Sequence, residues 1–430
     1  MASKLALLGG KPLTSKNFPR YNTIGEEEKR EVLEVLEGGV LSAFVANAGP
    51  AFYGGPKVQK LERAWEQYFG IKHAVTMNSA TSALEAAVTA CGIGPGDEVI
   101  TTPLTMSATA TAILSNNAVP VFADVDPLSL NLDPASVAKK ISAHTKAILA
   151  VHLTGHPSDM DPLSDIAKAH GLFLLEDNAQ APGATYRGRN TGCLGDIGIF
   201  SLNCHKTIQA GEGGVAVASD DDLALRLRLV RNHGEKSLEA FGYDGKVNLI
   251  GHNYRMTEME AAVGYHQLQK LKMLNDWRIN LADYLTGQIQ EKFDCIQTPY
   301  VAPDSTHVYY IYHMQYDQRI GRLPLDLFSK AIQAEGIPIM SRWGSPIYLQ
   351  PIYRNRSAFG NTGVPFQPPL YKGEVSYESG ICPVAEASEH TSLFIDTLVS
   401  WPNTNSDMDL IVKAIQKVLD NREDLLVSSQ

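Results

Sequence analysis

Lys206 is the residue whose surroundings most directly suggest chemistry. It lies between two short apolar runs, Ile197–Phe200 and Val215–Ala218, in a segment that also carries several glycines. Lysine is usually exposed, because burying its charge is costly unless the charge is paired or the amine is neutral. A buried lysine with a lowered pKa is what Schiff-base chemistry needs, since only the neutral amine attacks a carbonyl. For a single lysine, a solvated loop between two strands is the commoner explanation, so other residues have to decide.

The segment Asn78–Ser82 is a second candidate site, because it joins an expected strand to an expected helix. The first backbone N–H groups of a helix have no partner within the helix, and together with Ser and Thr hydroxyls they form a ready phosphate site. The simpler alternative is that Ser79 only caps the helix.

Two further groups stand where strands of an open α/β sheet end, which is where such sheets bind their ligands. Glu176-Asp177 directly follows the apolar run Leu172–Leu175. A carboxylate in that place can keep a pyridinium nitrogen protonated, although a loop or capping acid fits the position equally well. The segment from Gly251 to Glu258, with Asn253 and Arg255, leads into another expected helix. Taken alone, Thr257-Glu258 indicates only a cap and Arg255 an ordinary ion pair.

The composition excludes several classes of protein. The chain has 430 residues, enough for two domains, and its 44% hydrophobic and 20% charged residues are typical of a globular protein. With 37 basic and 47 acidic residues its formal net charge is −10, and it has no basic run, so we expect no nucleic-acid partner. The five cysteines lack CxxC spacing, which favours reduced thiols. No stretch resembles a signal peptide or a membrane span, so we expect a cytoplasmic protein without a membrane partner.

From His73 onward, short apolar runs alternate with helical patterns. The runs are continuous rather than alternating, which is typical of a mostly parallel sheet covered on both faces, and the fold class is therefore α/β. The expected strands are His73–Met77, Glu98–Thr102, Val119–Val125, Ala147–His152, Leu172–Glu176, Ile197–Leu202 and Val215–Ser219. The expected helices are Ala80–Ala90, Thr105–Leu114, Pro134–Ile141, one that ends at Ile166–His170, and Asp221–Arg231.

The organisation changes around Asn275–Asn280, after which fewer strands and helices alternate. We predict a large α/β domain over residues 1–275 and a smaller α+β domain over 276–430, joined by a helical region. The elements expected around and after the change are helices Glu258–Leu274, Arg278–Lys292, Leu325–Glu335 and Met408–Leu419 and the strand Val308–Gln315. Before the sheet, the glycine-rich and aromatic loop Val40–Pro56 is long enough to suggest that it closes over something.

The four groups, in this order, resemble the DegT–StrS sugar aminotransferases, a family of fold type I enzymes that use pyridoxal 5′-phosphate (PLP). The resemblance rests on Asp177, on Ser201 with Lys206 five residues later, on Glu212-Gly213-Gly214, and on Asn253-Tyr254-Arg255. It extends over almost the whole chain, with softer matches towards the C-terminus. It implies a mostly parallel, seven-stranded type of sheet between helices, with a smaller C-terminal domain.

The resemblance also implies roles for individual residues. Lys206 forms the Schiff base with PLP and moves the proton during transamination. Asp177 pairs with the pyridine nitrogen, and Met106 stands where many relatives carry an aromatic residue stacked on the ring. The remaining implied cofactor contacts are Gln180 to the ring or its 3′-oxygen, Ala80, Thr81 and Ser201 to the phosphate, and Asn253 to the phosphate of the neighbouring subunit. A homodimer with shared active sites follows from the last of these.

The implied reaction moves an amino group from glutamate or glutamine to a keto or aldehyde sugar. The product would be an amino sugar for a cell-surface polysaccharide such as lipopolysaccharide, or for a secondary metabolite. A nucleotide-linked keto-hexose, a cyclitol ketone and an octulosonate-type acid sugar all remain open as acceptors. Tyr53 in the long loop and Arg342 are candidate substrate contacts, although Arg342 is equally well explained as a surface arginine.

Two other functions fit the same family. A sugar dehydratase that uses pyridoxamine phosphate (PMP) carries histidine in place of the Schiff-base lysine; here His205 is adjacent, but Lys206 keeps the register from Ser201. A catalytically silent PLP-binding regulator would not need the lysine and would need a partner surface. The complete set of cofactor residues and the lack of a basic footprint favour transamination over both.

Overall fold

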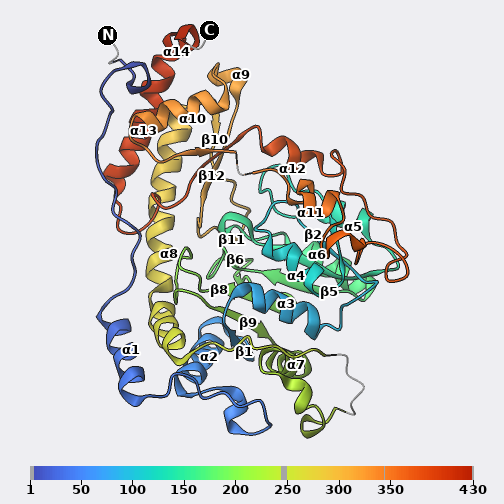
Figure 1. Cartoon of the computed structure of the whole chain (residues 1–430). Helices are drawn as coiled ribbons and strands as arrows, with labels where there is room; N and C mark the ends of the chain where they lie inside the picture. The colour runs from blue at the N-terminus through green and yellow to red at the C-terminus, as the bar shows by residue number, and fades with distance from the viewer. Residues whose placement is uncertain (1–3, 244–248, 343, 429–430) are drawn as a thin grey trace.

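The computed structural model describes residues 4–243, 249–342 and 344–428. Figure 1 shows a large sheet with helices on both sides, a smaller sheet at one end, and the long helix α8 (Glu258–Lys292) running from one part to the other. The N-terminal segment follows the outside of α8, so that both ends of the chain lie beside the smaller sheet.

The large sheet has seven strands in the order β1-β9-β8-β5-β4-β2-β3. Strand β9 runs antiparallel to both β1 and β8, and the neighbours from β8 to β3 are parallel. The strands are β1 (His73–Met77), β2 (Glu98–Thr101), β3 (Val119–Phe122), β4 (Thr145–Val151), β5 (Phe173–Asp177), β8 (Ile197–Ser201) and β9 (Gly214–Ala218). The predicted α/β class and the mostly parallel sheet are therefore confirmed, with most strands ending one to several residues earlier than expected.

Helices cover both faces because both sets of alternating strand residues are apolar. In β4, Ala147 and Leu149 pack into the core under α3, α4 and α7, whereas Ile148 and Ala150 pack into the core under α5 and α6. These helices are α3 (Ala80–Ala90), α4 (Ala108–Ser115), α5 (Pro134–Lys140), α6 (Met160–His170) and α7 (Asp221–Arg231). The expected helix Thr105–Leu114 begins three residues late, which leaves residues 105–107 in the loop after β2.

The smaller sheet has four strands in the order β10-β12-β14-β13, and helices α10 and α13 share its apolar core. The elements are β10 (Ile296–Gln297), β12 (Tyr312–Tyr316), β13 (Met340–Ser341), β14 (Ser392–Ile395), α10 (Leu325–Ala334) and α13 (Asn405–Asp420). A three-stranded sheet of β6 (Thr185–Tyr186), β7 (Arg189–Asn190) and β11 (Ser305–Thr306) was not expected from the sequence. The other helices are α1 (Glu26–Gly38), α2 (Pro56–Phe69), α9 (Gln318–Gly321), α11 (Pro351–Arg354), α12 (Pro383–Ser388) and α14 (Arg422–Ser428).

The prediction of separate helices over Glu258–Leu274 and Arg278–Lys292 is wrong, because α8 is continuous through both. Residues at the expected change of organisation, around Asn275–Asn280, bond to the surrounding protein within this continuous helix. Asn275 Nδ2 donates to the Pro182 carbonyl at 2.8 Å, and the buried Arg278 donates to the Tyr309 carbonyl at 3.2 Å. The boundary between residues 275 and 276 stays a prediction, since no break in the backbone marks it.

The N-terminal segment joins the smaller sheet rather than the large one. The buried carboxylate of Glu335 accepts hydrogen bonds from the backbone N–H of Ala6 and of Leu13, both at 2.8 Å, and from Lys417 at 2.6 Å. From there the chain passes along α8 towards Lys206, and the Tyr21 hydroxyl donates to the Thr207 carbonyl at 2.6 Å. In the part of the chain that the structure describes, no helix is long and apolar enough to cross a membrane.

Candidate active site

Strand register brings three of the sequence-predicted groups to one edge of the large sheet. Gly214, the first residue of β9, is paired on one side with Met77 at the end of β1 and on the other with Ser201 at the end of β8. Asp177 at the end of β5 is paired with Ile199 of β8. The segment after β1, the Ser201 hydroxyl and the Asp177 carboxylate therefore share the C-terminal edge at which open α/β sheets bind ligands.

The N-terminus of α3 presents free backbone donors at this edge. Ser79 caps the helix, its Oγ accepting from the Ser82 N–H at 3.0 Å. Within the described ranges, the N–H groups of Ala80 and Thr81 have no acceptor. A Cβ added to Gly214 would lie 2.5 Å from the Ala80 nitrogen, so only glycine lets the helix come this close to β9. The predicted cap is thus present, and the two free N–H groups next to it are available to an anion.

Lys206 lies near the tip of the loop between β8 and β9. The loop is closed by backbone bonds from Cys204 N–H to the Gly211 carbonyl at 2.8 Å and from Ala210 N–H to the Leu202 carbonyl at 2.8 Å. The Asn203 amide also donates to the Glu212 carboxylate at 3.0 and 3.1 Å. The two apolar strands that identified the segment in the sequence therefore hold both ends of a short, internally bonded loop that carries the lysine.

The environment of Lys206 favours its neutral form. Burial lowers the pKa of its amine, and the attraction of Asp177 and Asp396 offsets only part of that desolvation. Its Nζ lies 4.6 Å from the centre of the Tyr310 ring, and among the described residues it makes no hydrogen bond or ion pair. The bland alternative of a fully solvated loop lysine is therefore wrong, because the side chain is largely withdrawn from water.

The carboxylate of Asp177 is fixed by two donors. Thr109 in α4 donates from its hydroxyl to Oδ2 at 2.8 Å, and the Ala179 N–H donates to Oδ1 at 3.2 Å. The Thr109 hydroxyl also bonds to that of Thr105 at 2.7 Å. Met106, next to Thr105, is 66% exposed at the same edge, and its side chain is free to cover a ligand.

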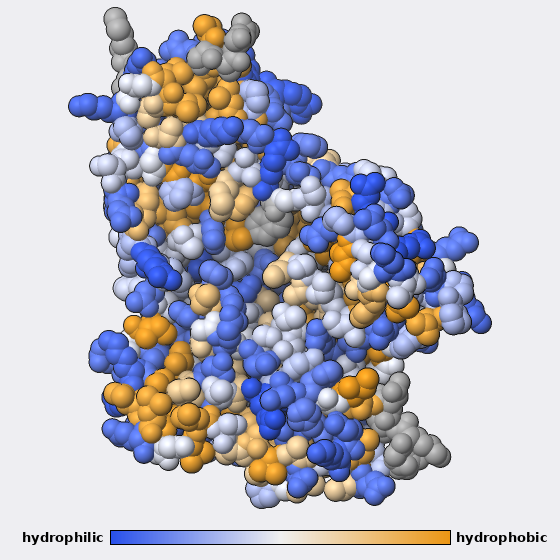
Figure 2. All heavy atoms as spheres, in the orientation of Figure 1, coloured by the Kyte–Doolittle hydropathy of each residue, from blue (hydrophilic) through white to orange (hydrophobic). Residues whose placement is uncertain are grey.

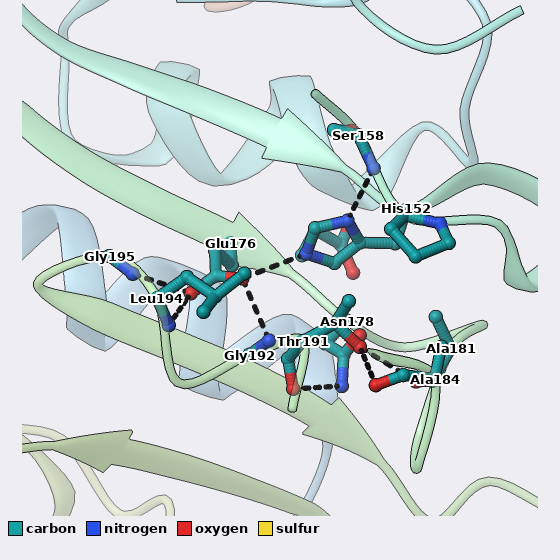
Figure 3. Close-up of polar contacts among 12 residues, drawn as sticks. His152, Ser158, Glu176, Asn178, Ala181, Ala184, Thr191, Gly192, Leu194 and Gly195 are labelled. Atoms are coloured by element: carbon teal, nitrogen blue, oxygen red, sulfur yellow. Dashed lines mark hydrogen bonds and ion pairs between the residues drawn. The ribbon is translucent and has the colours of Figure 1, made fainter. Parts of the chain in front are cut away.

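Figure 3 shows how Glu176, the neighbour of Asp177, ties the surrounding loops together. Its buried carboxylate accepts from Gly192 N–H at 2.7 Å and from Leu194 and Gly195 N–H, both at 2.6 Å. His152 Nδ1 accepts from the Ser158 N–H at 3.0 Å, so its proton is on Nε2, which donates to Glu176 at 2.9 Å. Four donors therefore fix the Glu176 carboxylate, and they keep rigid the end of β5 from which Asp177 extends.

Gln180 is placed beside Asp177 by the turn after β5. Its Oε1 accepts from the Thr154 N–H at 2.7 Å, which fixes the amide plane and leaves the NH₂ group as a donor. Asn253 is exposed and accepts from Arg255 Nε at 2.7 Å. The residue after it, Tyr254, contacts the segment before α3: its carbonyl accepts from the Asn78 N–H at 2.8 Å.

The two candidate substrate residues lie elsewhere. Tyr53 is 38% exposed, and the Arg228 guanidinium lies 5.7 Å from its ring centre. Its loop closes onto the end of α7, where Asn232 donates to the Val45 carbonyl at 3.0 Å. Arg342 is paired with Asp326 at 3.0 Å on the surface. None of the contacts described in the structure joins Tyr53 or Arg342 to Lys206.

Several residues at the site were missed in the sequence. Thr109 and Thr105 gave no signal beyond an expected helix, although their spacing of four residues does place two hydroxyls on one face of a helical turn. Tyr310 and Asp396 come from the second half of the chain and reach Lys206 only through the folded arrangement of the smaller sheet. Burial raises the pKa of Tyr310 to about 12, so its hydroxyl is neutral beside the lysine.

The arrangement of a withdrawn lysine, a fixed carboxylate and free helix N–H groups matches a known family. The sequence model of the DegT/DnrJ/EryC1/StrS aminotransferase family matches residues 22–378. The chain belongs to this family. As a DegT/DnrJ/EryC1/StrS aminotransferase, it is a PLP-dependent transaminase with the α/β fold of PLP fold type I enzymes.

The similar proteins act on sugars and cyclitols. L-glutamine:scyllo-inosose aminotransferase of Streptomyces griseus is 34% identical over 436 residues, which cover 98% of this chain and 99% of that protein. GDP-perosamine synthase of Caulobacter vibrioides is 37% identical over 306 residues, 70% of this chain and 79% of that protein. The crystal structure of S. venezuelae DesV in complex with a ketimine intermediate is 30% identical, with a TM-score of 0.76 over 92% of this chain and 94% of that one.

The residues at the edge fit the cofactor of the family. PLP carries a phosphate, a ring nitrogen and a carbonyl carbon, each of which needs a different partner. The free N–H groups of Ala80 and Thr81 suit the phosphate, and the glycine at position 214 leaves the helix terminus open to it. A buried carboxylate, Asp177, suits a protonated ring nitrogen, and the Lys206 amine, whose pKa burial lowers, suits the carbonyl.

Proposed function

We propose that this aminotransferase moves an amino group from glutamate or glutamine to a keto or aldehyde sugar or to a cyclitol ketone. The proposal rests on the amine of Lys206, which is withdrawn from water and whose pKa burial lowers. The amine lies near Asp177 and makes no hydrogen bond in the described part of the chain. The range of acceptors is supported by the relatives, one of which acts on scyllo-inosose and another of which makes GDP-perosamine.

Each residue of the edge has one task in this proposal. Ala80 and Thr81 bind the phosphate of PLP with their backbone N–H groups, and Ser201 adds its hydroxyl. Asp177 pairs with the ring nitrogen and is kept in place by Thr109. The further contacts are the Gln180 amide to the 3′-oxygen and the Met106 thioether against the ring face.

Lys206 acts as the covalent anchor and as the base. Bound PLP supplies the electron sink that makes the substrate carbon acidic. With the cofactor and substrate bound, the Lys206 amine would be the group that takes a proton from the substrate carbon and returns it. Burial lowers the pKa of the amine, which favours its neutral form, and the neighbouring Tyr310 ring excludes water from one side.

A homodimer that shares its active sites is part of the proposal, as is a cytoplasmic location. Asn253 is exposed and lies next to the residue that bonds to the α3 terminus, so it is available to a neighbouring subunit. Apolar side chains are exposed at the end of α1 and just after it, at Leu33, Leu36, Val40 and Leu41. Figure 2 shows apolar surface gathered in the region where α1 and α2 lie, which suits a subunit contact. The product would be an amino sugar for a polysaccharide or a secondary metabolite.

Two separate half-reactions test the proposal. The PLP form is mixed with L-glutamine or L-glutamate, and its conversion to the PMP form is followed by absorbance. The PMP form is then offered scyllo-inosose, a nucleotide-linked 4-keto-6-deoxyhexose and an oxidised octulosonate, and the return of the PLP form is followed. We expect one amino donor and at least one acceptor to react. If a donor converts the enzyme but none of these carbonyl compounds restores the PLP form, the assignment to sugars fails.

A further inference from the structure

A cavity of about 720 Å³ lies on the side of the Lys206 loop that faces the smaller sheet. Cys204 and His205, which directly precede the lysine, form part of its wall, and so does Asp396, whose carboxylate attracts the Lys206 ammonium. The opposite wall is the N-terminal segment Lys16–Tyr21. Its volume is in the range of small-molecule sites.

Much of the cavity wall lies outside the part of the chain that defines the family. The family match covers residues 22–378, whereas Lys16–Tyr21, Asp396 and Asn403 all lie beyond it. These residues can therefore differ in this chain without disturbing the cofactor residues. Residues of this wall are therefore suited to determining substrate specificity rather than to the chemistry that the family shares.

The wall presents hydrogen-bond acceptors that lack donors. Asn403 is 3% exposed, and its Oδ1 has no donor among the described residues. The half-buried carboxylate of Asp396 likewise receives no hydrogen bond in the described ranges, and burial raises its pKa. Gln333 also lines the cavity, but its side chain is exposed, so water can bond to its Oε1. Unpaired buried acceptors cost free energy, so each favours a ligand that brings an O–H or N–H group.

The charges in the wall disfavour a phosphate. Of the two cationic side chains on the N-terminal segment, Lys16 is held by Asp407, and Arg20 is exposed and has no acidic partner among the described residues. Asp396 places a carboxylate against any anion in the cavity. A nucleotide diphosphate would therefore meet one free guanidinium and a set of acceptors, whereas a ring with several hydroxyl groups would satisfy those acceptors.

We propose that this cavity binds the acceptor substrate as an unphosphorylated, polyhydroxylated ring ketone, with Asn403 and Asp396 accepting hydrogen bonds from its hydroxyl groups. The proposal rests on the function proposed above and narrows its acceptor class. The ring lies between the N-terminal segment and the loop after β14, with its carbonyl carbon turned towards Lys206. Asn403, outside the family match, is the residue that selects the hydroxylated ring.

The test measures binding apart from turnover. In the PLP form the enzyme has no amino group to give, so a ketone binds without reacting, and calorimetric titration with scyllo-inosose reports its dissociation constant. We expect Asn403→Leu to weaken binding about tenfold, the effect of one hydrogen bond lost from a substrate hydroxyl. The rate at which L-glutamine converts the PLP form should change less than about twofold, because the cofactor residues are untouched. Asn421→Leu, at the other end of α13 and 8% exposed, is the matched control and should bind the ketone as the wild type does.

A second variant guards against misfolding. The Gln209 side chain lines the same cavity and makes no hydrogen bond within the described chain, so Gln209→Leu should fold normally and weaken ketone binding a few-fold. Unchanged scyllo-inosose binding in both cavity variants would overturn the proposal. So would a wild-type enzyme that binds and aminates only the nucleotide-linked ketone, although the proposed sugar aminotransferase would then stand. If no ketone restores the PLP form, the proposed function itself fails.

Discussion

Replacing Thr109 by valine tests whether the hydroxyl next to Asp177 sets the cofactor site. Valine keeps the shape of threonine, and Thr109 is fully buried, so the change removes one hydroxyl with little repacking. The hydroxyl donates to Asp177 Oδ2 at 2.8 Å and bonds to Thr105 at 2.7 Å, and valine replaces neither bond. A hydrogen bond to a charged group is worth about 1.5–3 kcal/mol, and the group left unpaired adds to the cost.

The loss of the Thr109 hydroxyl should lower two measured quantities, the unfolding free energy and the affinity for PLP. The apoenzyme should lose about 2–3 kcal/mol of unfolding free energy, measured by urea denaturation. If Asp177 holds the ring nitrogen, the freed carboxylate also loses its fixed orientation, and PLP should bind at least about tenfold more weakly in equilibrium dialysis. The matched control is Thr101→Val: Thr101 is equally buried, but its hydroxyl donates to the neutral Leu149 carbonyl at 2.9 Å.

The control separates a structural hydroxyl from one that serves the cofactor. Thr101→Val should cost about 1 kcal/mol of unfolding free energy and leave the PLP dissociation constant unchanged. The reasoning is refuted if the two variants bind PLP equally well, because Thr109 would then support only the fold. It is also refuted if Thr109→Val binds PLP like the wild type while losing stability as expected.

Three other substitutions test neighbouring parts of the site. Glu176→Gln places an NH₂ group where one carboxylate oxygen accepts from two donors. We therefore expect the unfolding free energy, measured by urea denaturation, to fall by about 2–6 kcal/mol. A loss below about 1 kcal/mol would contradict the buried network. Burial lowers the pKa of Lys206, so the unfolded chain binds more protons than the folded one up to the ordinary lysine pKa of about 10.4, and the apoenzyme should gain stability with rising pH. Apo Lys206→Met should therefore be more stable than apo wild type at pH 7, by a margin that shrinks towards pH 10; a margin independent of pH would exclude titration of this amine as its cause. Gly214→Ala brings a Cβ to 2.5 Å from the Ala80 nitrogen and should weaken PLP binding at least about a hundredfold by dialysis, whereas Gly287→Ala, which meets no atom within 4 Å, should leave it unchanged.

The sequence predicted the sheet and its cofactor edge well because both depend on local patterns. Continuous apolar runs marked the strands of a covered parallel sheet, and the residues that follow β1, β5 and β8 were found at one edge because parallel strands end together. The lysine was found because its loop is bounded by two such runs. The strand ends were less accurate, since the last apolar residues of Val119–Val125 continue into the loop rather than the ladder.

Tertiary contacts decided what the sequence could not. The change of organisation around Asn275–Asn280 led us to expect two helices, but Asn275 and Arg278 bond to other segments and the helix continues through them. The acceptors in the cavity wall come from Asp396 and Asn403, nearly two hundred residues after Lys206, and no local pattern relates them to the lysine. Tyr53 and Arg342 were chosen for their residue type in long loops, and loop packing has no periodic signal to guide such a choice.

The central claim is that Lys206 holds PLP covalently, and borohydride trapping tests it most directly. The holoenzyme is reduced with borohydride, digested, and the phosphopyridoxyl group located by mass spectrometry. The account predicts one modified lysine, Lys206, and no modification in Lys206→Ala, which should also lack the visible absorbance band of lysine-bound PLP. A label on another of the lysines, or an unlabelled wild-type protein that has been saturated with PLP, would contradict the account.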